Sequence, residues 1–171
     1  FNWAAFDQDK VVSYAGYQYV LYWDADAVLV LARRRLADNS VQTLRFPAYT
    51  LSINPRDGHR NTVLGLSPED GRLHLSWDHH NNDLRYTRSR TGLLTAPPAG
   101  LSHDDFEPKQ ALLPDAPQKV TYPRFFNDGA ENLYFIYRSG GSGRGESVLS
   151  RYNASEGAWR IISTRLFSKS G

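Results

Sequence analysis

Four side chains suited to proton transfer or anion binding stand at matching places in two stretches of the sequence. His59 and His79 flank one predicted turn, and Tyr122 and Arg138 flank a later one. Imidazole exchanges protons near neutral pH, a phenol is a weak acid that becomes a base beside a cation, and a guanidinium group stays charged. We therefore take the four residues as candidates for one functional site.

Hairpin geometry brings the members of each pair together. The turn at residues 68–71 gives facing residues whose numbers sum to about 139, so His59 lies opposite His79 or His80. The turn at residues 127–132 gives sums near 259, which places Tyr122 opposite Arg138 to within one residue. In each pair, one residue comes from the start of the first strand and the other from the end of the second. Both pairs should therefore lie at the same height, unless the register slips by a residue.

The elements that carry these pairs are short strands that recur along the chain. Trp23, Trp77 and Tyr137 end similar aromatic runs at intervals of roughly 50–60 residues, and a further strand follows each run. Such a period, with about four strands in each unit, is typical of propeller blades. We predict strands near residues 11–14, 17–23, 27–34, 41–46, 62–66, 72–78, 84–90, 120–126, 132–137, 147–152 and 159–167.

These repeats predict an all-β fold, a partial β-propeller formed as a single domain by residues 1–171. The blades would cover approximately residues 1–50, 51–100 and 115–171, with about four strands in each. Equivalent ends of inner strands meet at the mouth of a propeller's central channel, so the four candidates would surround one pocket. The alternative is a β-sandwich in which the similarity between the three stretches is a coincidence.

Composition excludes several kinds of site. The sequence has no Cys, so it can form no disulfide, no thiolate zinc site and no cysteine nucleophile. No apolar run approaches the ~20 residues of a membrane helix, and no nucleic-acid-binding motif is present. The net charge of +2 is mild and suits an acidic partner without requiring one.

Three further motifs carry less information. His79 and His80 follow Asp78, but adjacent strand residues point to opposite faces, which argues against a shared metal ion. The acidic run at residues 103–107 offers oxygen ligands but lacks the loop pattern of a calcium site. The Gly-rich run at residues 140–145 lacks the strand–helix context of a phosphate loop and suits a close-approach loop beside Arg138. We predict that no cofactor and no catalytic metal are required. Nothing in the sequence supports a structural calcium.

The same motifs resemble the BNR-repeat-containing family of sugar-active propellers, and the resemblance covers essentially the whole chain. The motifs that carry it are Asp57-Gly58-His59-Arg60-Asn61, Ser76-Trp77-Asp78-His79-His80, Thr121-Tyr122-Pro123-Arg124-Phe125 and Tyr137-Arg138-Ser139-Gly140-Gly141. Members include ulvan lyases and rhamnose–glucuronate lyases, which are seven-bladed propellers with a His pair on one blade and a Tyr–Arg pair on the next.

The resemblance implies site residues. It implies that His59, His79, Tyr122 and Arg138 are catalytic. Three neighbours within the same motifs are candidate substrate-binding residues: His80, Asn61 and Arg124. One branch of ulvan lyases has zinc bound by Cys, and that metal is not carried over to a chain without Cys.

The resemblance also implies a reaction, the β-elimination of a polymer in which glucuronate or iduronate adjoins rhamnose. Arg138 would neutralise the uronate carboxylate, and Tyr122 with His59 or His79 would transfer the protons. The sequence does not decide which of them is base and which is acid. The expected partner is an acidic polysaccharide or oligosaccharide, with no nucleic-acid or membrane partner, and the expected location is secreted or periplasmic. The oligomeric state is left open.

Two other functions remain open at this point. A rhamnosidase or sialidase-like hydrolase needs two carboxylates at a defined separation, for which Asp24 and Asp78 stand at equivalent blade positions. A non-catalytic carbohydrate-binding propeller would use the same cleft without turnover. With three blades where the family has seven, and with no Met, we expect this chain to be the N-terminal portion of a propeller at least roughly twice as long.

Overall fold

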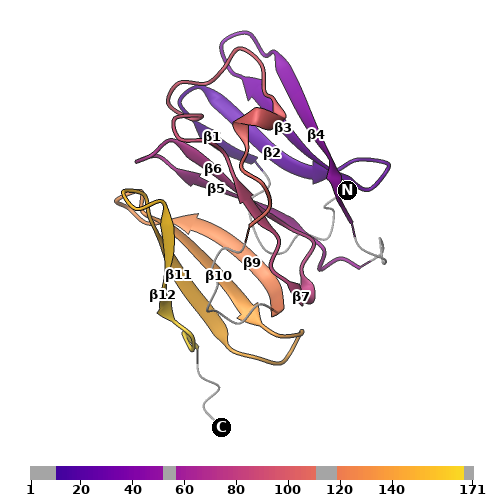
Figure 1. Cartoon of the computed structure of the whole chain (residues 1–171), viewed down its shortest axis with the longest axis vertical. Coiled ribbons are helices and arrows are strands. Elements are labelled where there is room, and N and C mark those ends of the chain that lie inside the picture. The colour runs from indigo at the N-terminus through magenta and orange to yellow at the C-terminus, as the bar shows by residue number, and fades with distance from the viewer. Residues whose placement is uncertain (1–10, 52–56, 111–118, 168–171) are drawn as a thin grey trace.

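The computed structural model describes residues 11–51, 57–110 and 119–167, and these form an all-β structure of three antiparallel sheets. The sheets follow one another in chain order along the long axis of the molecule (Figure 1). The described part holds β-strands and one short 3₁₀ helix, η1 (His103–Asp105). The all-β prediction is confirmed.

The first sheet is an antiparallel meander, with its strands in chain order. Each strand pairs with the next through a tight turn, and these turns have positive φ angles at Ala15, Gly16, Ala27 and Asn39. The strands are β1 (Val11–Tyr14), β2 (Tyr17–Trp23), β3 (Val28–Arg35) and β4 (Val41–Thr50). This sheet lies inside the predicted first blade.

The second sheet has three strands, where four were predicted. These strands are β5 (Thr62–Ser67), β6 (Arg72–Trp77) and β8 (Tyr86–Arg88). The described segment after η1 runs along β8 and the residue after it, with isolated bridges from Phe106 to Ser89 and from Gln110 to Tyr86. The Glu107 amide also donates to the Arg88 carbonyl at 2.9 Å.

The third sheet has five strands in the order β12-β11-β10-β9-β7. Four of them form the predicted third blade, and the fifth, β7, comes from the segment between β6 and β8 and was not predicted. The strands are β7 (His80–Asp83), β9 (Lys119–Asn127), β10 (Leu133–Ser139), β11 (Ser147–Asn153) and β12 (Ala158–Ser163).

The chain leaves the second sheet at β7 because its backbone turns there. Asp78 and Asn81 have positive φ angles of 63° and 57°, which direct the chain away from β6. The amide of Asn81 then donates to the Thr121 hydroxyl at 2.8 Å, and His80 pairs with Thr121 in the β7–β9 ladder. This strand joins the second sheet to the third.

Two hydrophobic clusters hold the sheets together. One lies between the first and second sheets and the other between the second and third. Trp23, Trp77 and Tyr137 are buried in these clusters, as expected of blade core residues. Gly65 on β5 lets the ring of Phe125 on β9 pack closely, since an added Cβ would lie 2.7 Å from Phe125 Cγ.

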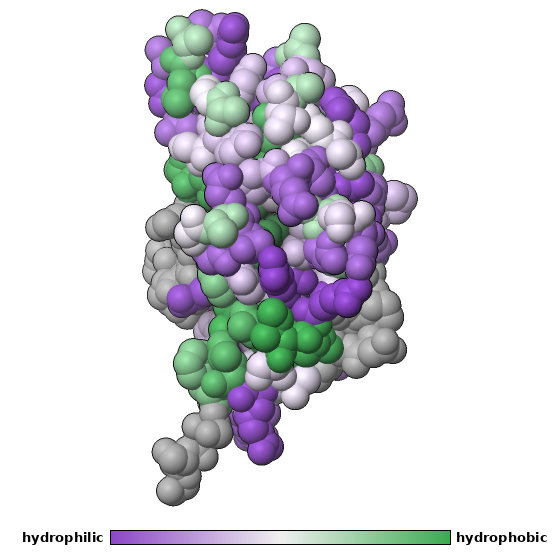
Figure 2. All heavy atoms as spheres, turned by 90° about the vertical axis from the view of Figure 1, so that its left-hand side faces the viewer, coloured by the Kyte–Doolittle hydropathy of each residue, from purple (hydrophilic) through white to green (hydrophobic). Residues whose placement is uncertain are grey.

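The outer side of the third sheet carries exposed apolar side chains. Figure 2 shows a hydrophobic area at the lower end of the face it presents. On the third sheet and directly after it, the exposed large hydrophobic residues are Phe126, Ile161, Ile162, Leu166 and Phe167. In the described residues, no helix has the length and apolar character needed to cross a membrane.

Candidate functional site

The predicted hairpin registers are confirmed. In the β5–β6 hairpin Thr62 pairs with Trp77, which places the residues before Thr62 beside those after Trp77. In the β9–β10 hairpin Ile136 pairs with Arg124 and Arg138 pairs with Thr121. The register shifts between these two pairs, so β9 has one extra residue there.

Tyr122 lies at this bulge and has a φ of 56°. A residue other than Gly rarely adopts this conformation, and β-bulges commonly redirect a side chain next to a functional site. The bulge turns Tyr122 out of the regular alternation of β9. Its phenol oxygen lies 3.1 Å from Nε2 of His59. This contact links the predicted His pair to the predicted Tyr122–Arg138 pair.

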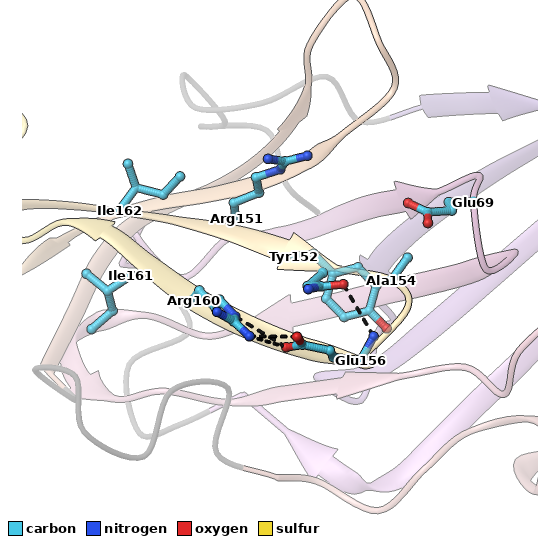
Figure 3. A pocket seen from close by; sticks show the side chains of 9 residues that line it. Glu69, Arg151, Tyr152, Ala154, Glu156, Arg160, Ile161 and Ile162 are labelled. Atoms are coloured by element: carbon cyan, nitrogen blue, oxygen red, sulfur yellow. Dashed lines mark hydrogen bonds and ion pairs between the residues drawn. The ribbon is translucent and has the colours of Figure 1, made fainter.

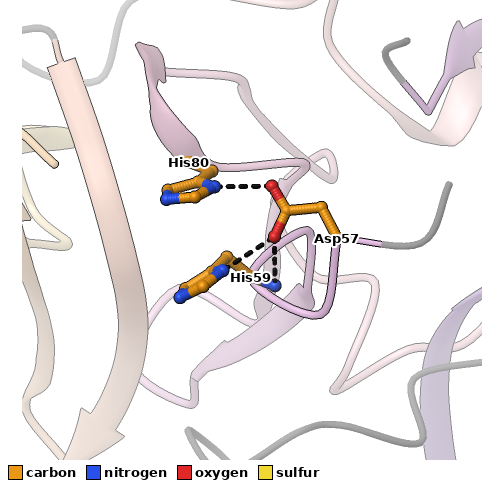
Figure 4. Close-up of side chains that lie close together, drawn as sticks. All are labelled: Asp57, His59 and His80. Atoms are coloured by element: carbon orange, nitrogen blue, oxygen red, sulfur yellow. Dashed lines mark hydrogen bonds and ion pairs between the residues drawn. The ribbon is translucent and has the colours of Figure 1, made fainter. Parts of the chain in front are cut away.

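The His pair that forms is His59 with His80. Their rings stack with centroids 4.0 Å apart and an interplanar angle of 21°. Asp57 holds both rings, with its Oδ1 2.7 Å from His59 Nδ1 and its Oδ2 2.5 Å from His80 Nδ1. Figure 4 shows the carboxylate beside the two stacked rings, with one oxygen toward each ring and the far nitrogen of each ring pointing away from it. Both rings are about three-tenths exposed, so a ligand can reach them.

Two further groups surround the Tyr122 phenol. The hydroxyl of Ser142, in the Gly-rich loop, lies 2.7 Å from the Tyr122 oxygen. The guanidinium carbon of Arg138 lies 5.4 Å from the centre of the Tyr122 ring, a cation–π distance. The structure thus brings His59, Tyr122 and Arg138 together, as the sequence predicted.

Asp57 is held as a carboxylate. Its partial burial raises its pKa, but hydrogen bonds from His80, the His59 amide and the His59 ring outweigh this and lower the pKa to about 2. Arg60 lies behind it, with Nε 3.6 Å from Asp57 Oδ2 and Nη1 3.2 Å from the buried Asp78. Arg85 also pairs with Asp78. This group of charges anchors the side of Asp57 that faces away from the rings.

His79 and Asn61, which were predicted to act at the site, lie in the interior. His79 has no exposed surface, its Nε2 is 2.9 Å from the Ser76 hydroxyl, and burial lowers its pKa to about 4. Asn61 is 2% exposed, and its backbone carbonyl accepts from the Asp78 amide. The left-handed backbone at Asp78 turns His79 inward and His80 outward. The hairpin sums allowed either residue to lie opposite His59, and the structure places His80 there.

Arg124, a predicted substrate-binding residue, is exposed on β9 and shares a pocket of about 420 Å³ with the Tyr122–Arg138 pair. The pocket therefore combines two guanidinium groups, two Tyr side chains and apolar walls. Its lining consists of Tyr122, Arg124, Ile136, Tyr137, Arg138, Ser147 and Phe167.

A larger pocket of about 560 Å³ lies elsewhere, on β11 and β12 (Figure 3). It includes none of the predicted site residues. Arg160 there forms an ion pair with Glu156 at 2.6 Å, and Arg151 donates to Asn132 at 2.6 Å, so both guanidinium groups have protein partners. The smaller pocket, by contrast, contains three of the predicted site residues, Tyr122, Arg124 and Arg138.

Asp57, His59 and His80 also form a group able to bind a metal ion, since one ligand atom from each lies within 4.8 Å of the others. The ring nitrogens nearest to the carboxylate already share hydrogen bonds with it. An ion bound through these two nitrogens would have to displace both hydrogen bonds.

Sequence reasoning did not identify Asp57 or Ser142 as functional. A signal for Asp57 was present in its position two residues before His59, because an Asp side chain commonly bonds the amide two residues on. The structure shows this bond, with Oδ1 3.0 Å from the His59 amide. Ser142 has no comparable signal, because its contact depends on the fold of a Gly-rich loop.

Two curated relatives are similar in sequence to most of this chain. Ulvan lyase, long isoform, of Glaciecola sp. (strain KUL10) is 23% identical over 188 residues, and the enzyme of the same name from Alteromonas sp. (strain LOR) is 25% identical over 188 residues. Each alignment covers 88% of this chain but 19% of the relative. The chain thus spans about a fifth of the length of these relatives.

Solved structures share the fold. Polysaccharide lyase Uly1 superposes with a TM-score of 0.79 at 19% identity, over 92% of this chain and 41% of that one. A PL25 ulvan lyase, also solved bound to -[GlcA(1-4)Rha3S]-, superposes with a TM-score of 0.68 at 13–14% identity, over 92% of this chain and 37% of that one. Each superposition covers nearly all of this chain and less than half of the solved lyase.

A further match is to a family rather than to a single protein. It begins at Tyr17, the first residue of β2, and includes every later strand. Residues 17–171, well over half of the sequence, match the BNR repeat-containing family, and the chain therefore belongs to that family.

Proposed function

We propose that the protein is a polysaccharide lyase that cleaves a uronate-containing polymer by β-elimination. The observation that carries the proposal is the position of the Tyr122 hydroxyl, 3.1 Å from His59 Nε2 and on a ring beside the Arg138 guanidinium group. β-Elimination needs a base, an acid and a cation near the uronate carboxylate, and these three side chains are of those types. The ulvan lyases among its relatives support the same reaction class.

The first task of the site is to make the C5 proton of the uronate easier to remove. Removing that proton places negative charge beside a carboxylate, which already bears one. Arg138 can bind the carboxylate through two parallel hydrogen bonds. Arg124 lines the same pocket and adds a second positive charge for an acidic chain.

The second task is proton transfer. In the proposed step, Tyr122 gives its proton to His59 and, as phenolate, takes the proton from C5. The electron pair of the C5–H bond forms the C4–C5 double bond, and the C4–O4 bond breaks with its pair on oxygen. The proton held by His59 then passes to Tyr122, and the Tyr122 hydroxyl proton passes to the leaving oxygen. Protons and electrons therefore balance. In this proposal His80, rather than His79, is the second histidine of the site.

The proposed substrate has glucuronate or iduronate next to rhamnose. The solved PL25 lyase was captured with -[GlcA(1-4)Rha3S]-, which supports this class of polymer. We include in the proposal a secreted or periplasmic location, where such a polymer is met, and a reaction that requires no cofactor.

The hydrolase alternative finds little support in its candidate carboxylates. Asp78 is fully buried and paired with Arg60 and Arg85. Asp24 pairs with Arg45 and accepts from the Val28 amide, and these bonds lower its pKa. Neither is an acid poised to protonate a glycosidic oxygen.

The test uses the full-length protein and a panel of uronate polymers, including ulvan. Elimination creates an unsaturated uronate that absorbs ultraviolet light, whereas hydrolysis does not. We expect absorbance to grow with the parent protein and with Arg34→Ala, a control on the exposed end of β3, and to be lost with Arg138→Ala. Release of sugar without absorbance would contradict the lyase proposal, and binding without release would favour a non-catalytic propeller.

A further inference from the structure

Asp57 is the centre of the hydrogen bonds that hold the two site histidines. Its Oδ1 accepts from the His59 amide at 3.0 Å and lies 2.7 Å from His59 Nδ1, while its Oδ2 lies 2.5 Å from His80 Nδ1. Its side chain is only 12% exposed. A single carboxylate thus fixes two imidazoles that come from different elements, the loop before β5 and the start of β7.

The charge of Asp57 decides where the imidazole protons lie. An ionised carboxylate can only accept hydrogen bonds, so each neutral ring that bonds to it must carry its proton on Nδ1. Both Nε2 atoms are then acceptors. His59 Nε2 faces the Tyr122 hydroxyl at 3.1 Å, so the Tyr122 proton is donated to His59. The Tyr122 oxygen in turn accepts from the Ser142 hydroxyl at 2.7 Å.

We infer that Asp57 is a positioning residue, which holds His59 and His80 as Nδ1–H tautomers and thereby makes His59 Nε2 the acceptor of the Tyr122 proton. The inference rests on the proposed lyase function for its kinetic consequences, but the tautomer itself can be measured without it. When His59 takes the proton, the imidazolium that forms stays bonded to the carboxylate. This stabilises the charge at the moment when Tyr122 becomes a base.

The surroundings of Asp57 explain why its position is fixed. Arg60 Nε lies 3.6 Å from Oδ2, and Arg60 is itself held by the fully buried Asp78 at 3.2 Å. The carboxylate therefore has a cation behind it and two imidazoles in front of it. Because both its oxygens are engaged, an amide in its place cannot serve both rings. One side of an amide donates, so Asp57→Asn would force a ring to place its proton on Nε2.

The direct test is ¹⁵N NMR of the imidazole nitrogens at a pH where the rings are neutral. The sequence has five His, and single His→Gln variants assign the signals of His59 and His80. We expect both rings to show Nδ1–H in the parent and at least one to change to Nε2–H in Asp57→Asn. The matched control is Asp83→Asn, which removes an exposed carboxylate of β7 paired with Lys119 and should leave both tautomers unchanged.

The kinetic test measures ultraviolet absorbance with Asp57→Ala, because in Asp57→Asn the amide oxygen can keep both bonds to His59, whose backbone N–H and Nδ1 lie against Oδ1. We expect Asp57→Ala to lower kcat by about 10²–10⁴-fold with little change in KM, since nothing then holds His59 as the Nδ1–H tautomer and a wrong tautomer blocks proton transfer rather than binding. The matched control Asp83→Asn should keep the kcat and KM of the parent. A residue with only a structural role would change KM together with kcat.

Several outcomes would overturn the inference. Nε2–H on His59 in the parent, or unchanged tautomers in Asp57→Asn, would remove its basis. Zinc bound at one equivalent by the parent and not by Asp57→Asn would instead assign the three residues to a metal site. If no polymer is cleaved while the tautomers behave as expected, the lyase proposal fails and the role of Asp57 in ordering the rings stands.

Discussion

At the scale of single residues, Tyr122 shows how the site uses backbone strain. Its φ of 56° places a bulky residue in a region that costs on the order of 1–3 kcal/mol. The bulge between Ile136 and Arg138 gives this conformation, and the contacts with His59, Ser142 and Arg138 all depend on it. The strain is therefore located at the group assigned to proton abstraction.

Replacing Tyr122 by Phe removes the hydroxyl and keeps the ring. We expect the elimination rate to fall by about 10²–10⁴-fold, the usual contribution of a general base, while the ring contacts with His59 and Arg138 preserve the fold. Ultraviolet absorbance measures the rate and urea unfolding measures stability. A variant that kept a third of the parent rate would exclude Tyr122 as the base.

The sequence predicted which residues pair across the hairpins better than it predicted which way their side chains point. Hairpin sums placed Tyr122 near Arg138 because antiparallel partners follow from the turn alone. They could not decide between His79 and His80, since the choice depends on the left-handed backbone at Asp78, which holds a residue other than Gly. Asp57 went unrecognised because it lies in a loop, where the regular alternation that locates side chains does not apply.

At the scale of elements, the Gly-rich loop between β10 and β11 brings Ser142 to the phenol. Gly140, Gly143 and Gly145 all have positive φ angles, which glycine adopts at no steric cost. At Gly145 an added Cβ would collide with the Ser139 carbonyl oxygen. The loop can close over Tyr122 only with glycine at this position.

Gly145→Ala should therefore displace the loop and separate Ser142 from Tyr122. We expect the rate to fall by about 10²-fold, the effect of a shift of about 1 Å at a reacting group, with the sheets unchanged in circular dichroism. The control is Gly129→Ala, whose added methyl meets no atom within 4 Å and should leave the rate unchanged. Equal rates for Gly145→Ala and the parent would show that the loop has no part in catalysis.

The strand β7 marks where prediction of elements failed. Residues 80–83 carry a His, two Asn and an Asp, which disfavour strands, and their pairing is with a strand nearly 40 residues further along the chain. Local propensity cannot reveal such a contact. The other strands were found because β-branched and aromatic residues alternate within them and turn residues separate them.

At the scale of the whole molecule, buried histidines couple the packing of the sheets to pH. His74 is fully buried between the second and third sheets, with Nδ1 2.6 Å from the Tyr86 hydroxyl and its ring against Tyr152. Burial lowers its pKa well below 6.5, and burial lowers that of His79 to about 4. Both rings are neutral in the folded protein.

These two histidines predict that the protein loses stability at pH values above those at which carboxylates take up protons. The unfolded chain takes up protons on these two residues below about pH 6.5 while the folded protein does not, so stability is full above that pH and falls as the pH decreases towards 4. The slope should approach about 1.4 kcal/mol per pH unit for each His. Urea unfolding at several pH values measures it, and His74→Gln should reduce the slope. An unchanged slope in that variant would contradict the assignment.

The contact between the second and third sheets also sets a limit on side-chain volume. An added methyl at Gly65 would lie 2.7–3.0 Å from three atoms of Phe125. We expect Gly65→Ala to destabilise the protein by about 1–3 kcal/mol through overpacking, measured by urea unfolding. Gly100→Ala, where an added methyl meets nothing within 4 Å, is the control. Equal stability of the two variants would show that the sheets can separate slightly without cost.

The pairing of β7 with β9 has a consequence for how such a site can be inherited. By sequence β7 belongs to the second repeat, but its ladder belongs to the third, and the histidines and the phenol meet only because of this overlap. Duplication or exchange of one repeat would carry half of the constellation. The smallest transferable unit is two adjacent repeats, so recombination can shuffle this chemistry only in pairs.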